Sequence, residues 1–214
     1  METAFTAYGD RGILLHTEDA AEREALNRSF AEAPPPGYAE HVWGHDTVLV
    51  VFSRLPADAA VRGWLGKLRP SRRRRHPEDA RSHEVPVHYD GPDLETVAEA
   101  AGMEVGAVID AHLNGDYRVR MIGFAPGFPY LDGLDARLRL DRRGSPRNRI
   151  SPGSVAIGGP YAGIYPVASP GGWHILGHTD LPVFQPDNAR GGPPNPRKVF
   201  TFFPGDRVRF TRAE

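Results

Sequence analysis

Residues 123–134 constrain the fold of this chain more than any other part of the sequence. They read GFAPGFPYLDGL, in which glycine, proline and aromatic residues alternate with almost no helix-forming residues. Glycine adopts backbone angles that other residues resist, and proline fixes φ and removes a backbone N–H donor. We therefore expect neither a regular helix nor a central strand here. We expect an ordered loop that holds its rings in fixed positions and carries function.

Two later segments have the same character. Residues 152–159 read PGSVAIGG, and residues 169–179 read SPGGWHILGHT. Glycine and proline are concentrated in this second part of the chain, whereas helix-like spacing of apolar residues is found mainly before residue 123. This asymmetry favours a first part that contains helices and a second, loop-rich β part.

Composition bounds the class of protein. The chain has 214 residues, 40% of them hydrophobic, which is enough for one large or two small packed domains. Its formal net charge of -1 gives no reason to expect nucleic acid or an anionic membrane as a partner. The absence of cysteine excludes disulfides, thiolate catalysis and cysteine-type zinc sites. No signal-like or membrane-spanning stretch is present, so we expect a cytoplasmic protein.

The chain divides into two predicted domains. Residues 1–82 are expected to form a small α+β domain, in which strands accompany helices at residues 18–33 and 56–68; a ferredoxin-like arrangement is our expectation. Residues 69–82 carry four consecutive arginines between Pro70 and Pro77 and are expected to be a linker rather than an anion-binding patch. Residues 83–214 begin with a strand and two helices, at residues 93–101 and 105–113, and continue as short strands. Asp93 is placed to cap the first of these helices.

In this order, the three loop segments resemble the allophanate hydrolase subunit 1 family over about residues 85–210. The resemblance implies a cyclophilin-like β-barrel for residues 83–214. Family members differ in activity. They include the B subunit of the prokaryotic ATP-dependent 5-oxoprolinase, the sporulation kinase inhibitor KipI, and subunits related to urea carboxylase and allophanate hydrolase.

The closest resemblance is to the 5-oxoprolinase subunits. It implies a subunit that is inactive alone and that helps to open the lactam of 5-oxoproline to L-glutamate with ATP hydrolysis. The implied partners are subunits of types A and C, with ATP and Mg shared between the subunits. Two alternatives stay open: a regulator that binds and inhibits a histidine kinase, as KipI does, and a subunit related to urea carboxylase or allophanate hydrolase. The chain has no biotin-attachment Met-Lys motif, so it would not carry biotin itself.

The candidate catalytic residues are Arg147, His174 and His112. Arginine forms bidentate bonds with phosphate or carboxylate, and Arg147 lies in the motif Ser-Pro-Arg just before the second loop segment. Histidine titrates near neutrality, which suits it to orienting or protonating a substrate. His112 matches the family's spacing before the first loop segment, although a structural role for it stays open.

Two further sets of residues are candidates for binding. The turns after Pro152 and Pro170 could present backbone N–H groups to an anion. The predicted cofactor-binding residues are Ser154, Gly153, Gly171, Gly172 and Arg149. The predicted substrate pocket consists of Phe124, Phe128, Tyr130 and Trp173, with core packing as the alternative.

We predict no metal site. His174 and His178 are four residues apart but lack an obvious third ligand. At the position of His178 the family more often has arginine. The turn at residues 88–94 is also shorter than the family's usual glycine-rich turn.

Overall fold

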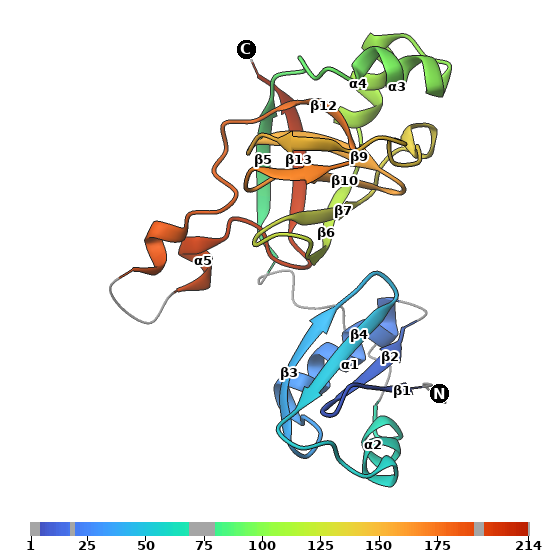
Figure 1. Cartoon of the computed structure of the whole chain (residues 1–214), viewed down its shortest axis with the longest axis vertical. Coiled ribbons are helices and arrows are strands. Elements are labelled where there is room, and N and C mark those ends of the chain that lie inside the picture. Colours follow the sequence, from blue (N-terminus) through green and yellow to red (C-terminus); the bar gives the residue numbers. More distant parts are fainter. Residues whose placement is uncertain (1–4, 18–19, 69–79, 191–194, 214) are drawn as a thin grey trace. The chain divides into compact units, whose positions relative to one another are not determined.

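The computed structural model describes residues 5–17, 20–68, 80–190 and 195–213 (Figure 1). The chain divides into two compact units, Met1–Asp79 and Ala80–Glu214. Most of the predicted linker, residues 69–82, lies outside the described residues. The boundary at residues 82 and 83 therefore stays a prediction.

The first unit is a four-stranded antiparallel sheet with two helices. The strand order is β1-β2-β4-β3. The strands are β1 (Phe5–Tyr8), β2 (Gly12–His16), β3 (Tyr38–Trp43) and β4 (Thr47–Phe52), and the helices are α1 (Ala20–Glu32) and α2 (Asp58–Leu65). The order of elements, ββαββα, differs from the βαββαβ order of a ferredoxin-like domain. The ferredoxin-like arrangement is therefore not confirmed.

Alternation of apolar residues explains the core of this unit. In β4 every second side chain is fully buried, at Val48, Val50 and Phe52, as expected for a strand with one face on a core. Helix α2 buries Trp64 and Leu65 against the same cluster.

The second unit is built on a seven-stranded mixed sheet of order β12-β9-β10-β7-β6-β13-β5. Only the β13–β5 pair is parallel. The strands are β5 (Ser82–Val87), β6 (Tyr117–Ile122), β7 (Pro129–Asp132), β9 (Ser154–Gly158), β10 (Tyr161–Ile164), β12 (His174–His178) and β13 (Arg207–Arg212). A separate ribbon pairs β8 (Arg147–Ile150) with β11 (Ser169–Gly171).

The helices of this unit are short. Helices α3 (Leu94–Ala101) and α4 (Val105–Leu113) pack on each other at one end of the sheet (Figure 1). Two 3₁₀ turns (Ala136–Leu138 and Pro186–Ala189) and a short α5 (Pro196–Val199) complete the elements. Within the described residues, no helix has the length and apolar character needed to cross a membrane.

The two edges of the seven-stranded sheet meet, so that it nearly closes into a barrel. His88, just after β5, exchanges backbone hydrogen bonds of 2.8 and 2.9 Å with His178 at the end of β12. The chain then continues along β12, where the N–H of Gly91 donates to the carbonyl of Leu176 at 3.1 Å. A Cβ at Gly177 would collide with the carbonyl oxygen of His88, so this seam requires glycine. The shortened turn that the sequence shows at residues 88–94 is this seam. The predicted mainly-β barrel is confirmed at this level.

Candidate functional site

The first loop segment holds a phenylalanine in a strained conformation. Phe124 has φ +65°, a left-handed angle that residues other than glycine rarely adopt. The N–H of Ala125 donates to the carbonyl of Gly123 at 2.7 Å, and this bond across three residues makes a γ-turn of the rare, positive-φ kind. The Phe124 side chain is 61% exposed. Strain of this kind concentrates at functional sites, where the surrounding structure enforces it.

A cluster of aromatic rings lies next to this turn. The ring of Phe128 is surrounded by those of Tyr130, Tyr165 and Trp173, with centroid distances of 5.1, 5.1 and 5.3 Å. Phe128 is only 1% exposed and Trp173 5%, so both are core residues of this cluster. Core packing is therefore the role that the structure gives Phe128 and Trp173. Pocket lining stays a prediction for Phe124 and for the partly exposed Tyr130.

Arg147 is held by a carboxylate of the same chain. Its guanidinium group donates from Nη1 to Oδ2 of Asp93 at 2.8 Å and from Nη2 to Oδ1 at 2.9 Å, a bidentate pair. Arg143 donates from Nη1 to the same carboxylate at 2.7 Å, and the N–H of Ile175 donates to it at 2.7 Å. The Asp93 side chain is 2% exposed. We call this group the Asp93 clamp. It joins the start of α3, residues 141–147, which we call the arginine loop, and β12.

The clamp fixes the charge state of Asp93. Burial by itself raises the pKa of the carboxyl group. The hydrogen bonds from Arg147 and Ile175 and the charges of both arginines outweigh burial, so the pKa lies below its ordinary value. Asp93 is therefore ionised at neutral pH. The clamp contains two positive groups and one negative group.

The clamp changes the interpretation of Arg147. The sequence predicts that it binds an anionic ligand, but the bonds in the structure make it a positioning residue. Replacing Arg147 by alanine should remove two charge-assisted bonds and lower the free energy of unfolding by about 2 kcal/mol. Lysine should restore less than half of this loss, because an ammonium group cannot form the bidentate pair. Urea denaturation of the two variants measures this, and an unchanged midpoint for Arg147→Ala would contradict it.

The two histidines of the prediction are both buried. His174, at the start of β12, donates from Nε2 to the carbonyl of Asp141 at 3.0 Å. A carbonyl oxygen can only accept, so a neutral His174 carries its proton on Nε2. Its Nδ1 is a buried acceptor with no partner among the described residues. His174 therefore fixes the main chain where the arginine loop begins.

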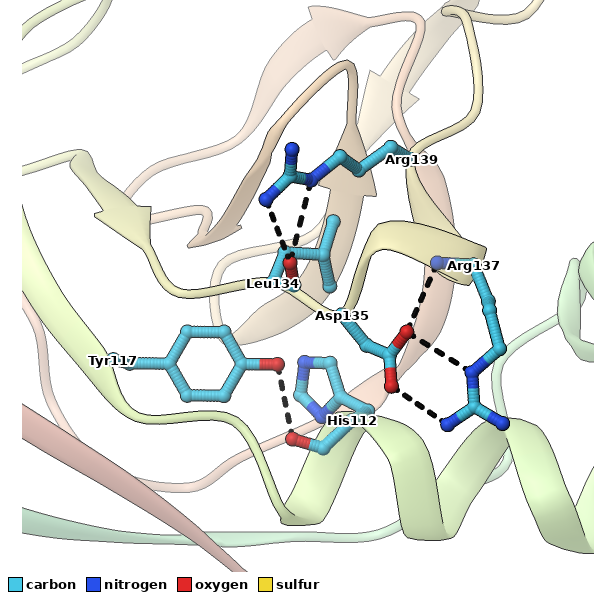
Figure 2. A network of polar contacts seen from close by, with 6 residues as sticks. All are labelled: His112, Tyr117, Leu134, Asp135, Arg137 and Arg139. Atoms are coloured by element: carbon cyan, nitrogen blue, oxygen red, sulfur yellow. Dashed lines mark hydrogen bonds and ion pairs between the residues drawn. The ribbon is translucent and has the colours of Figure 1, made fainter.

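His112 lies at the end of α4 and is fully buried. Its Nδ1 is 2.8 Å from the hydroxyl oxygen of Tyr89, and the hydroxyl of Tyr117 donates to its backbone carbonyl at 2.9 Å (Figure 2). In the turn that follows Leu134, Asp135 binds Arg137 (Figure 2). Burial lowers the pKa of His112 to about 3, so the ring is neutral at physiological pH. These contacts support the structural role that the sequence left open.

The predicted anion-binding turns use their backbone groups within the protein. The N–H of Gly153 donates to the carbonyl of Tyr165 at 2.8 Å, and the N–H of Ser154 donates to that of Ser151 at 3.3 Å. Gly153 has φ +81°, and a Cβ there would collide with the carbonyl of Thr179. The backbone geometry of the turn therefore explains why position 153 is glycine. These two amides do not form a cradle for phosphate.

The glycines of the other turn lie against aromatic and arginine side chains. A Cβ at Gly171 would collide with the hydroxyl of Tyr165, and one at Gly172 would contact the Cβ of Arg142 at 3.8 Å. Arg149, on β8, is exposed. Cofactor binding by these residues stays a prediction. Among the described residues, no cluster of three or more histidine or acidic side chains could hold a metal ion.

Sequence reasoning missed the central role of Asp93. It predicts a helix cap, and Asp93 does occupy the position before α3, but its side chain makes no capping hydrogen bond. The carboxylate instead accepts hydrogen bonds from Arg143 and Arg147. The sequence signal that could have found it is the group of arginines in residues 142–149, at positions 142, 143, 147 and 149. They require an acidic partner somewhere in the fold if any of them is to be buried.

Comparison with known proteins places the chain in a family. The carboxyltransferase domain, subdomain C and D, matches residues 3–193. The B subunit of 5-oxoprolinase from Bacillus subtilis (strain 168) is 45% identical over 132 residues, which are 60% of this chain and 52% of that protein. The B subunit of 5-oxoprolinase from Escherichia coli O157:H7 is 44% identical over 135 residues, 62% of this chain and 58% of that protein. The chain thus spans about half the length of these curated relatives.

Solved structures agree with the fold. The crystal structure of TTHA0988 matches with a TM-score of 0.75 and 37% identity, covering 95% of this chain and 40% of that one. The urea carboxylase of Kluyveromyces lactis matches with a TM-score of 0.75 at 19% identity, covering 99% of this chain and 22% of that one, and shows the fold alone. These findings confirm the family resemblance that the loop segments indicated. The chain belongs to the family of the carboxyltransferase domain, subdomain C and D.

Proposed function

We propose that this chain is the B subunit of an ATP-dependent 5-oxoprolinase complex, which opens the lactam of 5-oxoproline to L-glutamate. The observation that carries the proposal is the identity of 44–45% with curated 5-oxoprolinase subunits of this type. The relatives give no support to the kinase-inhibitor alternative.

The chemistry of a lactam explains why ATP would be needed. An amide is a poor electrophile, and ATP with Mg supplies a phosphoryl group that makes its oxygen a good leaving group. The Gly153 and Ser154 amides are occupied within the barrel, which argues against a phosphate cradle at that turn. We therefore propose that the nucleotide is bound in the assembled complex, with partner subunits of types A and C.

For this chain's own residues we propose positioning roles. Arg147 and Arg143 hold the arginine loop against α3 through Asp93, and His174 fixes the main chain at Asp141. His112 anchors the end of α4 through Tyr89 and Tyr117. None of these groups is arranged as a nucleophile with its base among the described residues, which supports a subunit that is inactive alone.

Reconstitution tests the proposed function. We expect the purified chain to release no L-glutamate from 5-oxoproline and ATP, because it lacks a complete catalytic group. Adding subunits of types A and C should produce turnover that requires all three proteins. Glutamate release measured for each protein alone, for each pair and for the three together checks this. Full turnover by the chain alone would refute the subunit role, and no turnover by the three together would refute the 5-oxoprolinase assignment.

A further inference from the structure

Among the hydrogen-bond donors of the second unit that have no acceptor within the described residues, three act near the aromatic cluster: the hydroxyls of Tyr130 and Tyr165 and the guanidinium group of Arg142. The hydroxyl of Tyr165 lies near the backbone N–H of Trp173, and its own proton has no acceptor there. The hydroxyl of Tyr130 forms no hydrogen bond within the same residues. Arg142 is exposed and forms neither a hydrogen bond nor an ion pair with them. Its neighbour Arg143, by contrast, binds the Asp93 clamp.

These donors lie close together. The rings of Tyr130 and Tyr165 both contact Phe128, each with a centroid distance of 5.1 Å. The hydroxyl of Tyr165 lies against Gly171, and the Cβ of Arg142 lies next to Gly172. Burial raises the pKa of both tyrosines, and in each case the nearby positive charge of Arg142 acts in the opposite direction. Both phenols thus belong to one aromatic cluster, and the positive charge of Arg142 acts on both of them.

The surroundings hold these groups in place. Tyr165 is 2% exposed, and its hydroxyl oxygen lies against the backbone of Gly171. A buried hydroxyl proton without an acceptor is unfavourable, and buried polar groups in folded proteins are nearly always satisfied. The main chain before Arg142 is fixed by His174 at Asp141, and the chain after it by the Asp93 clamp. The donors are therefore prepared for an acceptor from outside the chain.

The strained turn adds an apolar wall. The ring of Phe124 stands edge-on to Tyr165 at 6.2 Å and to Phe128 at 5.4 Å, and most of it faces solvent. Glycine at position 124 would adopt this angle without strain. The presence of phenylalanine there therefore indicates that the ring itself has a role. A small ring carried by the ligand could pack on this face.

We propose that Arg142, Tyr130 and Tyr165 form a site for the carboxylate of a small cyclic acid, with the ring of Phe124 as the wall of the site. The three donors supply one charged and two neutral hydrogen bonds, which suits a single oxyanion. A carboxylate on a flat ring is favoured over a phosphate because an aromatic wall adjoins the donors. Identifying the acid as 5-oxoproline rests on the proposed function.

Binding of 5-oxoproline to the purified full chain, measured by calorimetry, tests this site. Arg142→Ala should weaken binding by about ten- to a hundredfold, and Tyr130→Phe and Tyr165→Phe by about three- to tenfold each. Arg118→Ala is the matched control, because Arg118 is an exposed arginine of the same unit whose backbone on β6 pairs with Asp132 and Arg207, and not with Tyr130. It should leave the affinity unchanged. The uncharged amide of 5-oxoproline should bind as weakly as 5-oxoproline binds to Arg142→Ala.

Phe124→Gly separates binding from stability. It relieves the positive-φ strain, so the melting midpoint should stay or rise, while the affinity for 5-oxoproline should fall. Unchanged affinity together with loss of association with the partner subunits would overturn the wall and make Phe124 a protein-docking residue.

Other outcomes would also overturn the site. These are the absence of 5-oxoproline binding to the chain, equal affinities for Arg142→Ala and Arg118→Ala, and binding of inorganic phosphate in place of 5-oxoproline. The last of these would assign the donors to a nucleotide phosphate. Turnover of the reconstituted complex is a separate measurement. If it fails while Arg142-dependent binding persists, the proposed function is wrong and the carboxylate site stands.

Discussion

Replacing Asp93 by alanine should lower the free energy of unfolding of the second unit by about 3–5 kcal/mol. The change removes the buried carboxylate that Arg143 and Arg147 share and leaves their positive charges uncompensated. Two guanidinium groups and one backbone N–H share this single carboxylate, at distances of 2.7–2.9 Å. No other acidic group is bonded to Arg143 or Arg147 among the described residues. Their mutual repulsion would then act in a partly desolvated place.

Urea denaturation, monitored through hydrogen exchange of the β12 amides, measures this loss in the second unit. Asp93→Asn should have an intermediate effect, because the amide oxygen still accepts one bond while the charge is lost. Asp187→Ala is the control, since the Asp187–Arg190 pair is 80% and 85% exposed and should contribute at most about 1 kcal/mol. A loss below about 1 kcal/mol for Asp93→Ala would show that the clamp does not stabilise the barrel.

The elements that the sequence predicted well are those with a strong local pattern. The helix expected at residues 93–101 is α3, and the helix expected at residues 105–113 is α4. In both, the apolar residues repeat with the period of the element, so the signal lies within a few residues. The closure of the barrel could not be predicted from a local sequence pattern. It depends on His88 meeting His178, ninety positions apart, through backbone bonds that any residue could make.

The candidate site shows the same limit. The sequence located the arginine loop and the aromatic loop, because their residue types are unusual. It could not supply the partner of Arg147, which is 54 positions away in sequence. It also could not predict the γ-turn at Phe124, because a left-handed angle at phenylalanine contradicts local preference and exists only where the fold enforces it. Non-local pairing and enforced strain are properties of the packed structure.

The stability of the second unit should also fall steeply as the pH is lowered from about 6.5 to about 3, and His112 should be the main cause. Burial lowers the pKa of His112 from 6.5 to about 3. Between these two pH values His112 is protonated in the unfolded chain but stays neutral in the folded chain, so unfolding is favoured as pH falls. The slope approaches about 1.4 kcal/mol per pH unit, which gives roughly 3 kcal/mol between pH 7 and pH 4.

The surroundings of His112 explain why its ring stays neutral in the folded chain. Its ring contacts the rings of Tyr89, Tyr117 and Phe210, and no carboxylate of the described residues is bonded to it. Ionised Asp93 acts in a different window. Its pKa lies below the ordinary 3.8, so its stabilisation is present above that pH and is lost only as pH falls further, through its lowered value. The loss between pH 6.5 and 4 therefore belongs to histidine and not to the clamp.

His112→Gln tests this assignment, because glutamine does not titrate and still offers Tyr89 a hydrogen-bond acceptor. The variant is expected to be less stable at pH 7, where the packing of the imidazole ring is lost, but its stability should change little between pH 6.5 and 4. His178→Gln, at a side chain that is 45% exposed, should keep the slope of the unaltered protein. Urea denaturation of the three proteins at half-unit pH intervals gives the slopes directly. A slope in His112→Gln equal to that of the unaltered protein would assign the acid sensitivity to another group and leave His112 with a purely steric role.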